Sequence, residues 1–569
     1  MYSRTGRRKA VMPTDMQQED LAKLDKQTLI TLLMTAVSSN AAMQKTIDNL
    51  NKSIDILTEE VHNLRQERFG RKSEKNLGIS NEQYTFIFNE TEVTIDTYKK
   101  DADKADAVSS PEETPTEEII YKRKKPVGKR KEDLSKIQER EVVMHKLSEA
   151  ELLDLFPDGK WSRLPDEVYE RVDIIPATLK VYEHHVAVYK GTTSKKIVRA
   201  PRPADPLRNS VATNGIIAAI ANAKFVNSIP VHRFAQEIER GNDVTISTQD
   251  MCYWINYCAD KYLSRLTTRL HQEMMSCRVI QADETPCTVN HDGRPAGAKS
   301  YMWVYRTGEH EEHPVILYEY QKTRKADHPR EFLKDFQGFC VTDGYQVYHT
   351  IDGERENLKI SGCWAHAKRR FATVVKTLGE ASKGTFAQHA LGLIDSMYHF
   401  EKMYKDMTPE DRLTKRQERI APLVDAFFAY LKNDGAKVAP KSKTGEAITY
   451  CLNQEKYLRV FLTDGNIPID NNAAERAIRP FCVGKHNWMV IDTISGAKAS
   501  AIWYSLAETA KANDLKPYEY FKYLLEQIVP HGEYDDPSFL EDLLPWSEKL
   551  PDKCRRKKLT PETDPLNKK

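Results

Sequence analysis

The stretch PIDNNAAERAIRP, residues 468–480, predicts a helix that opens with polar capping residues. Any of residues 470–472 (Asp-Asn-Asn) can accept hydrogen bonds from the free N–H groups of the first turn, and the alanines that follow favour helix. Pro480 is expected to end the helix. One acid, Glu475, lies in the first turns. Taken alone, the stretch is typical of a capped surface helix with a Glu475–Arg479 ion pair.

Two short apolar stretches upstream change this interpretation. Residues 278–283 (RVIQAD) and 338–345 (GFCVTDGY) each predict a buried strand that ends in an acid. Between them, 300–306 and 314–320 predict a hairpin, and about 328–336 predicts a helix. The order β-β-β-α-β, with acids after the first and fourth strands, is that of a ribonuclease-H-like fold. Side chains converge at strand ends in such sheets, so a site is expected there.

Three carboxylates, from Asp283, Asp343 and Glu475, would then meet in one cleft. Their repulsion makes sense if divalent metal neutralises it, and Mg²⁺ prefers oxygen ligands while keeping positions for water and phosphate. Two ions about 3.5–4 Å apart can stabilise both the attacking and the leaving oxygen at a phosphodiester. Glu284 competes with Asp283 for the first role. Asp343 can alternatively cap a turn before Gly344.

The composition excludes several classes of protein. The 569 residues are enough for about three or four domains, and 40% apolar with 30% charged residues predicts a soluble chain. No apolar run reaches the ~18 residues of a membrane span, and the N-terminus lacks a secretory pattern, so a cytoplasmic location is expected. The net charge is only +2, so nucleic-acid binding would depend on local patches. Nine cysteines without a C-x-x-C pair argue against disulfides and a Cys-rich zinc site.

The N-terminal part of the chain is expected to consist of a basic arm, a helix and a linker. Residues 1–16 predict a disordered basic arm, and 17–75 predict a helix. Its apolar positions follow a heptad seam at Met43, Ile47, Leu50, Ile54, Leu57, Val61 and Leu64. The β-branched a positions and leucine d positions favour a parallel two-stranded coiled coil, and a single helix packed on its own domain is the alternative. Residues 76–135 predict a charged flexible linker, whose basic run 121–131 is either a phosphate contact or solvated.

A small mixed α/β domain is predicted at 136–205. Strands are expected at 169–175 and 179–189. His184 and His185 fit a surface strand better than a metal site, because no cysteine lies nearby.

Residues 206–276 predict helices. A helix at 230–239, a turn at 240–242 and a second helix from Ser247, with Asp250 in the capping-box position, fit a helix-turn-helix that binds DNA. Ordinary helix packing fits the same pattern.

The rest of the chain is mostly helical in pattern. Residues 365–464 predict helices with little strand signal. A short strand is expected at 487–491, helices at 496–513 and 517–528, and a polar tail with a hydrophobic patch at 539–546.

Several of these stretches together resemble a DDE-type transposase of the insertion-sequence-66 family. The resemblance is carried by ADETP at 282–286, VTDGY at 341–345, CWAHAKRRF at 363–371, DNNAAERAIRP at 470–480 and YSLAETAKAN at 504–513. It extends to the zipper, with RFGR at 68–71, and to LLPW at 543–546, and so covers most of the chain.

The resemblance implies roles for particular residues. Asp283, Asp343 and Glu475 would be the catalytic triad and would hold Mg²⁺ or Mn²⁺ as two ions. Cys363 and His366 resemble the C-x-x-H signature of several transposase groups, with a structural or DNA-positioning role. The candidate DNA contacts are Lys368, Arg369, Arg476, Arg479, Lys485 and His486. For Arg479, Lys485 and His486, a solvated surface is the alternative.

The resemblance also implies an α+β multidomain architecture. A ribonuclease-H-like catalytic core at 277–364 and 465–515 would be interrupted by an all-helical insertion at 365–464. A helix and tail at 516–569 would complete the chain. Family members commonly carry a cysteine zinc-binding module before the core, whereas residues 136–205 contain no cysteine, so no zinc is expected.

The implied function is DNA transposition in a bacterial cytoplasm, at the nucleoid. The protein would bind the terminal inverted repeats of its element, pair them by dimerisation through 43–64, cut the 3′ ends and join them to target DNA. Accessory proteins of the same element are candidate partners. A non-catalytic coiled-coil DNA-binding regulator and a metal-dependent nuclease of the same fold remain alternatives.

Overall fold

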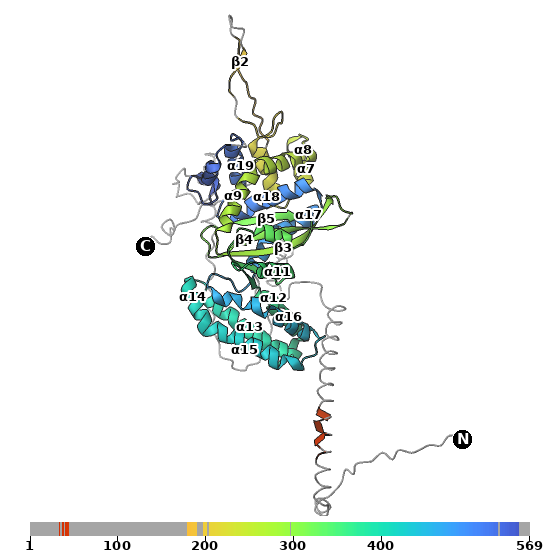
Figure 1. Cartoon of the computed structure of the whole chain (residues 1–569). Coiled ribbons are helices and arrows are strands. Elements are labelled where there is room, and N and C mark those ends of the chain that lie inside the picture. Colours follow the sequence, from red (N-terminus) through yellow and green to blue (C-terminus); the bar gives the residue numbers. More distant parts are fainter. Residues whose placement is uncertain are drawn as a thin grey trace, which may run out of the picture.

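A computed structural model describes residues 179–190, 197–201, 204–295, 297–532 and 535–556, together with scattered positions between Met34 and Gln44 (Figure 1). Most of the predicted coiled coil at 43–64 lies outside the described residues. The predicted linker lies outside them as well, as do the strand expected at 169–175 and the rest of residues 136–178.

A six-stranded mixed sheet forms the centre of the molecule (Figure 1). Five strands lie in the order β5-β4-β3-β6-β7, and the short β8 pairs with the far end of β3. The strands β3, β4 and β5 are antiparallel neighbours, whereas β6 and β7 run parallel to β3. The bounds are Val279–His291 (β3), Lys299–Thr307 (β4), Ile316–Gln321 (β5), Gly338–Thr342 (β6), Leu358–Gly362 (β7) and Ile491–Thr493 (β8).

The sheet differs from its prediction in three places. The strand β3 does not end at Asp283 but continues to His291, because the pairing with β4 extends to Thr288. The helix α10 (Asp327–Phe332) ends earlier than expected. The strand β7 and the helix α11 (Gln346–Glu354) were not predicted.

Helices that precede the sheet in the sequence and helices that follow it pack together on one side of the sheet (Figure 1). They are α6 (Asn214–Ala221), α7 (Val231–Asn242), α8 (Thr248–Cys258), α9 (Ser264–Met275), α18 (Ile494–Ala512) and α19 (Pro517–Ile528). The helix α18 covers the edge strand β5: the Ser505 hydroxyl accepts the N–H of Tyr318 at 2.8 Å. Thr509 Oγ1 accepts the N–H of Ile316 at 3.0 Å and donates to its carbonyl at 2.9 Å. An exposed sheet edge is thereby closed to pairing.

The α7–α8 pair has the predicted capping box. Ser247 accepts the N–H of Asp250 at 3.0 Å and donates to its carboxylate at 2.7 Å. The predicted turn at 240–242 is wrong, because α7 continues to Asn242 and the chain turns at Asp243, which is left-handed with φ 54°.

The helices between β7 and α17 form a separate bundle on the other side of the sheet, named here the α12–α16 bundle (Figure 1). Its members are α12 (Trp364–Leu378), α13 (Phe386–Met403), α14 (Pro409–Lys415), α15 (Ala421–Asn433) and α16 (Lys443–Leu458). Trp364 is buried at its centre against Phe427, Phe428 and Phe461, and its Nε1 donates to the carbonyl of Leu458 at 2.8 Å. This contact connects the first and last helices of the bundle.

The stretch around Glu475 forms the helix α17 (Asn472–Trp488). The prediction that Pro480 ends it is wrong. Proline removes one helical hydrogen bond, but the buried face continues past it from Ala477 and Ile478 to Phe481. The strand expected at 487–491 is also misplaced, since Trp488 is still helical and β8 begins at Ile491.

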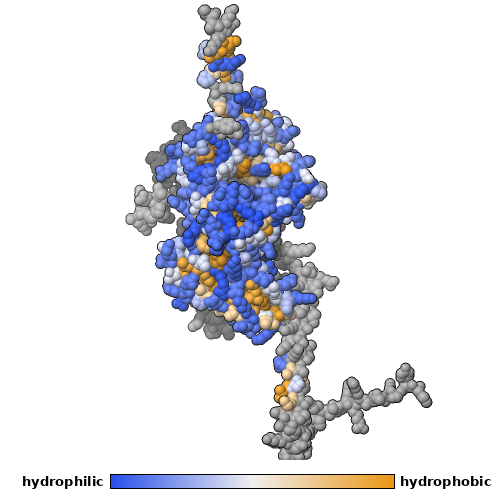
Figure 2. Space-filling model, viewed as in Figure 1, coloured by the Kyte–Doolittle hydropathy of each residue, from blue (hydrophilic) through white to orange (hydrophobic). Residues whose placement is uncertain are grey.

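A two-stranded antiparallel ribbon, β1 (Val188–Lys190) and β2 (Ile197–Arg199), projects from the helical side (Figure 1). Residues 179–187 of the expected strand at 179–189 have no regular structure. Figure 2 shows a mostly hydrophilic surface on the viewed face, with hydrophobic patches on the ribbon and on the α12–α16 bundle. No helix among the described residues is long and apolar enough to cross a membrane.

Candidate functional site

Two of the predicted acids lie at the point where β3 and β6 part. The parallel pairing of these strands ends with Gln281 opposite Val341. The same register, continued by two residues, sets Asp283 opposite Asp343. The pairing therefore explains why two carboxylates far apart in sequence come together.

The N-terminus of α17 is attached to β3 beside Asp283. The Asn471 side chain donates to the carbonyl of Ala282 at 2.8 Å, and the Gln281 amide donates to the carbonyl of Asp470 at 3.3 Å. Asn471 and Gln281 are fully buried. These bonds fix the start of the helix against the strand that carries the first acid, and Glu475 follows one turn later.

The N-cap residue of α17 is Asn471, whose side chain makes no capping bond, and Asp470 before it accepts a hydrogen bond from the first turn instead. Its carboxylate accepts the N–H of Asn472 at 3.0 Å and the hydroxyl of Tyr398 at 2.9 Å. Burial raises the pKa of Asp470, whereas these two hydrogen bonds oppose the rise. The first turn of α17 is thus fixed both to the sheet and to α13.

Cys363 and His366 lie where α12 meets α17. Cys363 is buried, and its Sγ accepts the N–H of Asn471 at 3.2 Å. His366 Nε2 lies 3.6 Å from Glu475 Oε1. Burial raises the pKa of the Cys363 thiol and lowers the pKa of His366. The two residues therefore contact different parts of the same helix start.

Glu475 is half-buried between α17 and α12. Arg369 lies 3.4 Å from its Oε2, and His366 faces its Oε1. Among the described residues, Glu475 Oε1 and His366 Nδ1 are buried without a hydrogen-bond partner. The third acid is thus paired with two groups that can carry positive charge.

The electrostatics of Asp283 connect the three acids. Burial raises its pKa well above the usual range, and the charges of Glu284, Asp343 and Glu475 raise it further. Its Oδ1 accepts the N–H of Glu284 at 2.9 Å, and Asp343 Oδ1 accepts the N–H of Tyr345 at 2.9 Å. The charges of the other two proposed acids therefore both reach Asp283. In the part of the chain that the structure describes, however, no three His, Cys, Asp or Glu side chains are grouped closely enough to hold a metal ion.

The competing acid Glu284 already has a cation. Arg324 Nε donates to it at 2.7 Å, and the Tyr348 hydroxyl donates at 3.3 Å. Burial raises the pKa of Glu284 to about 7, the charge of Asp343 adds to the rise, and Arg324 opposes it. Successive side chains of a strand point to opposite faces, so Asp283 and Glu284 diverge. The Arg324 pair favours Asp283 as the acid that remains available.

The donor set suits a hard divalent cation. Asp283, Asp343 and Glu475 offer carboxylate oxygens only, which Mg²⁺ and Mn²⁺ prefer. A cation beside them would offset the repulsion that raises the pKa of Asp283, and the unpaired Glu475 Oε1 would gain a partner. The residues therefore fit such an ion if Glu475 turns away from Arg369.

The predicted DNA contacts on α12 are paired with acids. Lys368 lies 2.8 Å from Asp395, and Arg369 contacts Glu475. Both basic residues are therefore already partly neutralised in the free protein.

The predicted contacts on α17 are Arg476, Arg479, Lys485 and His486. Arg476 is exposed and lies 3.2 Å from Glu309. Lys485 Nζ donates to the carbonyl of Pro286 on β3 at 2.8 Å. Arg479 is half-buried and His486 is exposed. These residues line one helix beyond the third acid.

One contact beside the acids was not predicted from the sequence. The Tyr450 hydroxyl of α16 donates to the carbonyl of Asp343 at 3.3 Å. Gly344 has φ +85°, and a Cβ there would lie 3.1 Å from Gln454 Oε1 and 3.2 Å from the Tyr450 hydroxyl. The helical pattern around Tyr450 could not predict this contact, because Tyr450 and Asp343 are far apart in sequence.

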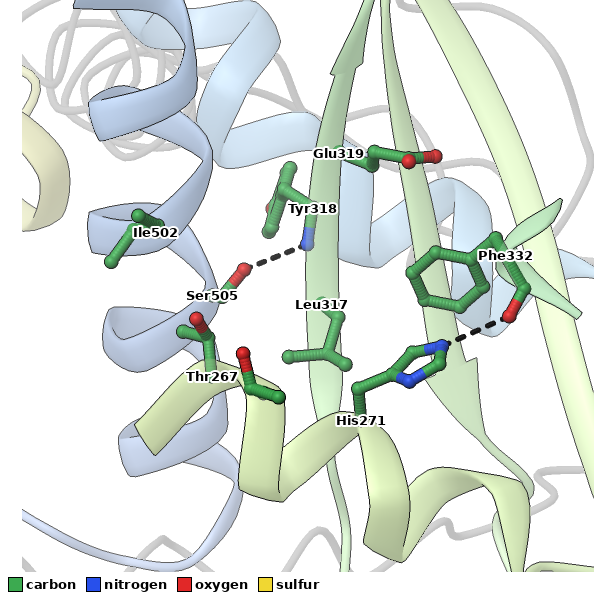
Figure 3. Close-up of a pocket in the computed structure, with 9 residues that line it drawn as sticks. Thr267, His271, Leu317, Tyr318, Glu319, Phe332, Ile502 and Ser505 are labelled. Carbon is green, nitrogen blue, oxygen red and sulfur yellow. Dashed lines mark hydrogen bonds between the residues drawn. The ribbon is translucent and has the colours of Figure 1, made fainter. Parts of the chain in front are cut away.

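A separate pocket of about 200 Å³ lies between α9, β5 and α18 (Figure 3). It is lined by Thr267, Thr268, His271, Leu317, Tyr318, Glu319, Phe332, Ile502 and Ser505. His271 Nε2 lies 2.9 Å from the carbonyl oxygen of Phe332. None of the predicted site residues lines this pocket.

Three sequence profiles of known families match the chain. The one described as "Transposase IS66 family" matches residues 209–499, just over half of the chain. Those described as "IS66 C-terminal element" and "Transposase C of IS166 homeodomain" match residues 505–546 and 56–143.

Three uncharacterized proteins of Sinorhizobium fredii (strain NBRC 101917 / NGR234) are similar to this chain. The protein y4qI is 25% identical over 529 residues, which cover 91% of this chain and 93% of y4qI. The protein y4jD is 29% identical over 401 residues, 69% of this chain and 77% of its own length. The protein y4hP is 24% identical over 406 residues, 69% of this chain and 72% of its own length.

Proposed function

The chain belongs to the IS66 family of transposases, and we propose that it cuts the 3′ ends of an insertion sequence and joins them to target DNA. Asp283, Asp343 and Glu475 are the proposed catalytic triad. The observation that carries this assignment is the geometry at one end of the sheet: Asp343 directly follows β6, which pairs with β3, and Asn471 attaches the start of α17 to β3 beside Asp283.

The proposed cofactor is Mg²⁺ or Mn²⁺, as two ions, which would supply Lewis-acid activation of water or a 3′-hydroxyl and neutralise charge on the leaving oxygen. The chain's own residues hold the carboxylates. Asp283 lies on β3 and Asp343 directly follows the neighbouring strand β6, and the Asn471 and Asp470 contacts fix the helix turn before Glu475. Arg369 pairs with Glu475 and balances its charge before DNA binds, and His366 faces the other carboxylate oxygen.

A ribonuclease-H-like fold for the central sheet is part of the proposal. It is supported by the strand order β5-β4-β3-β6-β7, with an antiparallel meander followed by two parallel strands. We also propose that the α12–α16 bundle is the helical insertion, and that dimerisation uses the heptads at 43–64, most of which lie outside the described residues.

The proposed DNA partners are the terminal inverted repeats of the element and the target. The basic residues of α12 and α17 support this role by their place beside the acids, although several are paired with carboxylates in the free protein. On DNA binding, these basic side chains would leave their carboxylate partners and contact phosphates instead.

A strand-transfer assay tests the proposal. Purified protein is incubated with Mg²⁺, a labelled duplex carrying the element's end and a supercoiled target plasmid. The proposal predicts cut ends and end–target joints. Cut ends that are never joined would identify a nuclease, and binding without either product would identify a regulator.

A further inference from the structure

The helix α12 carries three consecutive basic residues, of which the third differs from the other two. Lys368 and Arg369 are paired with Asp395 and Glu475. Arg370 is exposed and has no acidic partner among the residues that the structure describes. Its guanidinium instead lies 4.1 Å from the ring centroid of Tyr450 on α16. The charge of Arg370 is therefore available to a ligand.

Tyr450 connects this arginine to the second acid. The helices α12 and α16 are packed side by side on the sheet-facing side of the bundle (Figure 1). The Tyr450 hydroxyl donates to the carbonyl of Asp343, and the same hydroxyl lies against Gly344. One tyrosine therefore holds both the loop of Asp343 and the guanidinium plane of Arg370.

A guanidinium that stacks on an aromatic ring keeps its N–H donors at its edge and loses little freedom when they bind. Planar, paired donors match the oxygens of a phosphate group. The neighbouring acids repel DNA phosphates, so a fixed cation beside them would help to hold the strand.

We propose that Arg370, oriented by Tyr450, binds a phosphate of the DNA strand that is cut, close to the scissile position. The proposal rests on the transposase function and adds two substrate-positioning residues to it. Arg370 holds the phosphate, and Tyr450 fixes the distance between that phosphate and the loop of Asp343.

The test is a phosphate-replacement scan in Ca²⁺, without cleavage. The probe is a duplex that carries the element's terminal repeat with its flanking DNA, and each copy has one phosphate near the cut replaced by an uncharged methylphosphonate. For the wild-type protein, one replacement should weaken binding about tenfold, as expected for the loss of one charged hydrogen-bonded contact.

Arg370→Gln should weaken binding to the unmodified duplex about tenfold, and the sensitive methylphosphonate should then cause no further loss. Tyr450→Leu, which removes the stacking ring, should reduce the effect of that methylphosphonate, whereas Tyr450→Phe should keep it. The matched control is Lys376→Gln on the last turn of the same helix, exposed and without an acidic partner among the described residues. It should leave both the affinity and the sensitive position unchanged.

If Arg370→Gln and each methylphosphonate weaken binding independently, so that their losses of affinity add, the proposal is overturned. A loss of affinity of the same size from Lys376→Gln would overturn it as well. If Arg370→Gln fails to fold, Arg370→Lys serves in its place. Lysine keeps the charge but not the planar, paired N–H donors of the guanidinium, so binding by this variant should be much less sensitive to that methylphosphonate. If the wild-type protein cuts and joins DNA while the losses stay additive, this inference alone fails. If the wild-type protein neither cuts nor joins ends, the proposed function fails first.

Discussion

At the residue scale, the third acid has two possible partners. Glu475 is paired with Arg369 and His366 in the free protein, and the same carboxylate is proposed to hold metal. An ion pair at a partly exposed position contributes only about 0–1 kcal/mol. A divalent cation and a DNA phosphate together can therefore displace it, Glu475 turning to the metal and Arg369 to the phosphate.

A second residue-scale feature lies away from the acids, at Glu319 on β5. Its Oε1 accepts the amide of Gln321 at 2.8 Å, while its Oε2 is buried with no hydrogen-bond partner among the described residues. Burial raises the pKa of Glu319 from 4.5 to about 7. The folded state therefore keeps a proton that the unfolded chain releases above about pH 4.5.

This shift predicts a pH-dependent stability. The contribution of Glu319 is fully present below about pH 4.5 and is lost as the pH rises through about 7, a difference on the order of 1–3 kcal/mol. Glu319→Gln mimics the protonated form, so it should raise the melting temperature at pH 8 and change it little at pH 4.5. Thermal melts at both pH values test this. An equal shift at the two pH values would contradict the burial argument.

At the element scale, helix starts were easier to predict than strands. The helix α19 begins at Pro517 and ends at Ile528 as expected, because proline is favoured in the first turn. Ser247 and Asp250 likewise marked the start of α8. Pro480 misled the prediction, since tertiary burial of Ala477 and Phe481 outweighs the lost hydrogen bond. The strand β7 was missed because a stretch such as LKISG is too short to show a period.

The contact between the β6–α11 loop and α16 gives an element-scale prediction. Gly344→Ala adds a Cβ close to Gln454 and Tyr450 at a left-handed position, so the loop must shift. We expect a stability loss of about 1–2 kcal/mol and a cleavage loss of at least about tenfold, because Asp343 moves with the loop. Adding Gln454→Ala should restore part of the cleavage. Unchanged cleavage by Gly344→Ala would show that cleavage does not depend on the position of this loop.

At the scale of the whole molecule, the sequence suggested which acids to propose for the site but not the contacts that position them. The family motif around Glu475 and the two upstream aspartates could be recognised from residue patterns alone. The register that sets Asp283 opposite Asp343, the Asn471 bonds to β3 and the Arg324–Glu284 pair depend on distant contacts. Such contacts leave no local pattern, so no single stretch could predict them.

The central claim is that three carboxylates from two strands and one helix act as one metal-dependent site. The most direct measurement compares wild-type protein with Asp343→Asn in the Mg²⁺ strand-transfer assay, alongside end-duplex binding in Ca²⁺. Asparagine keeps the size of the side chain and can still accept the N–H of Tyr345, so the fold and DNA binding should persist. The account predicts a loss of cutting and joining of at least about a thousandfold with binding unchanged. Cleavage by Asp343→Asn at the wild-type rate would contradict it.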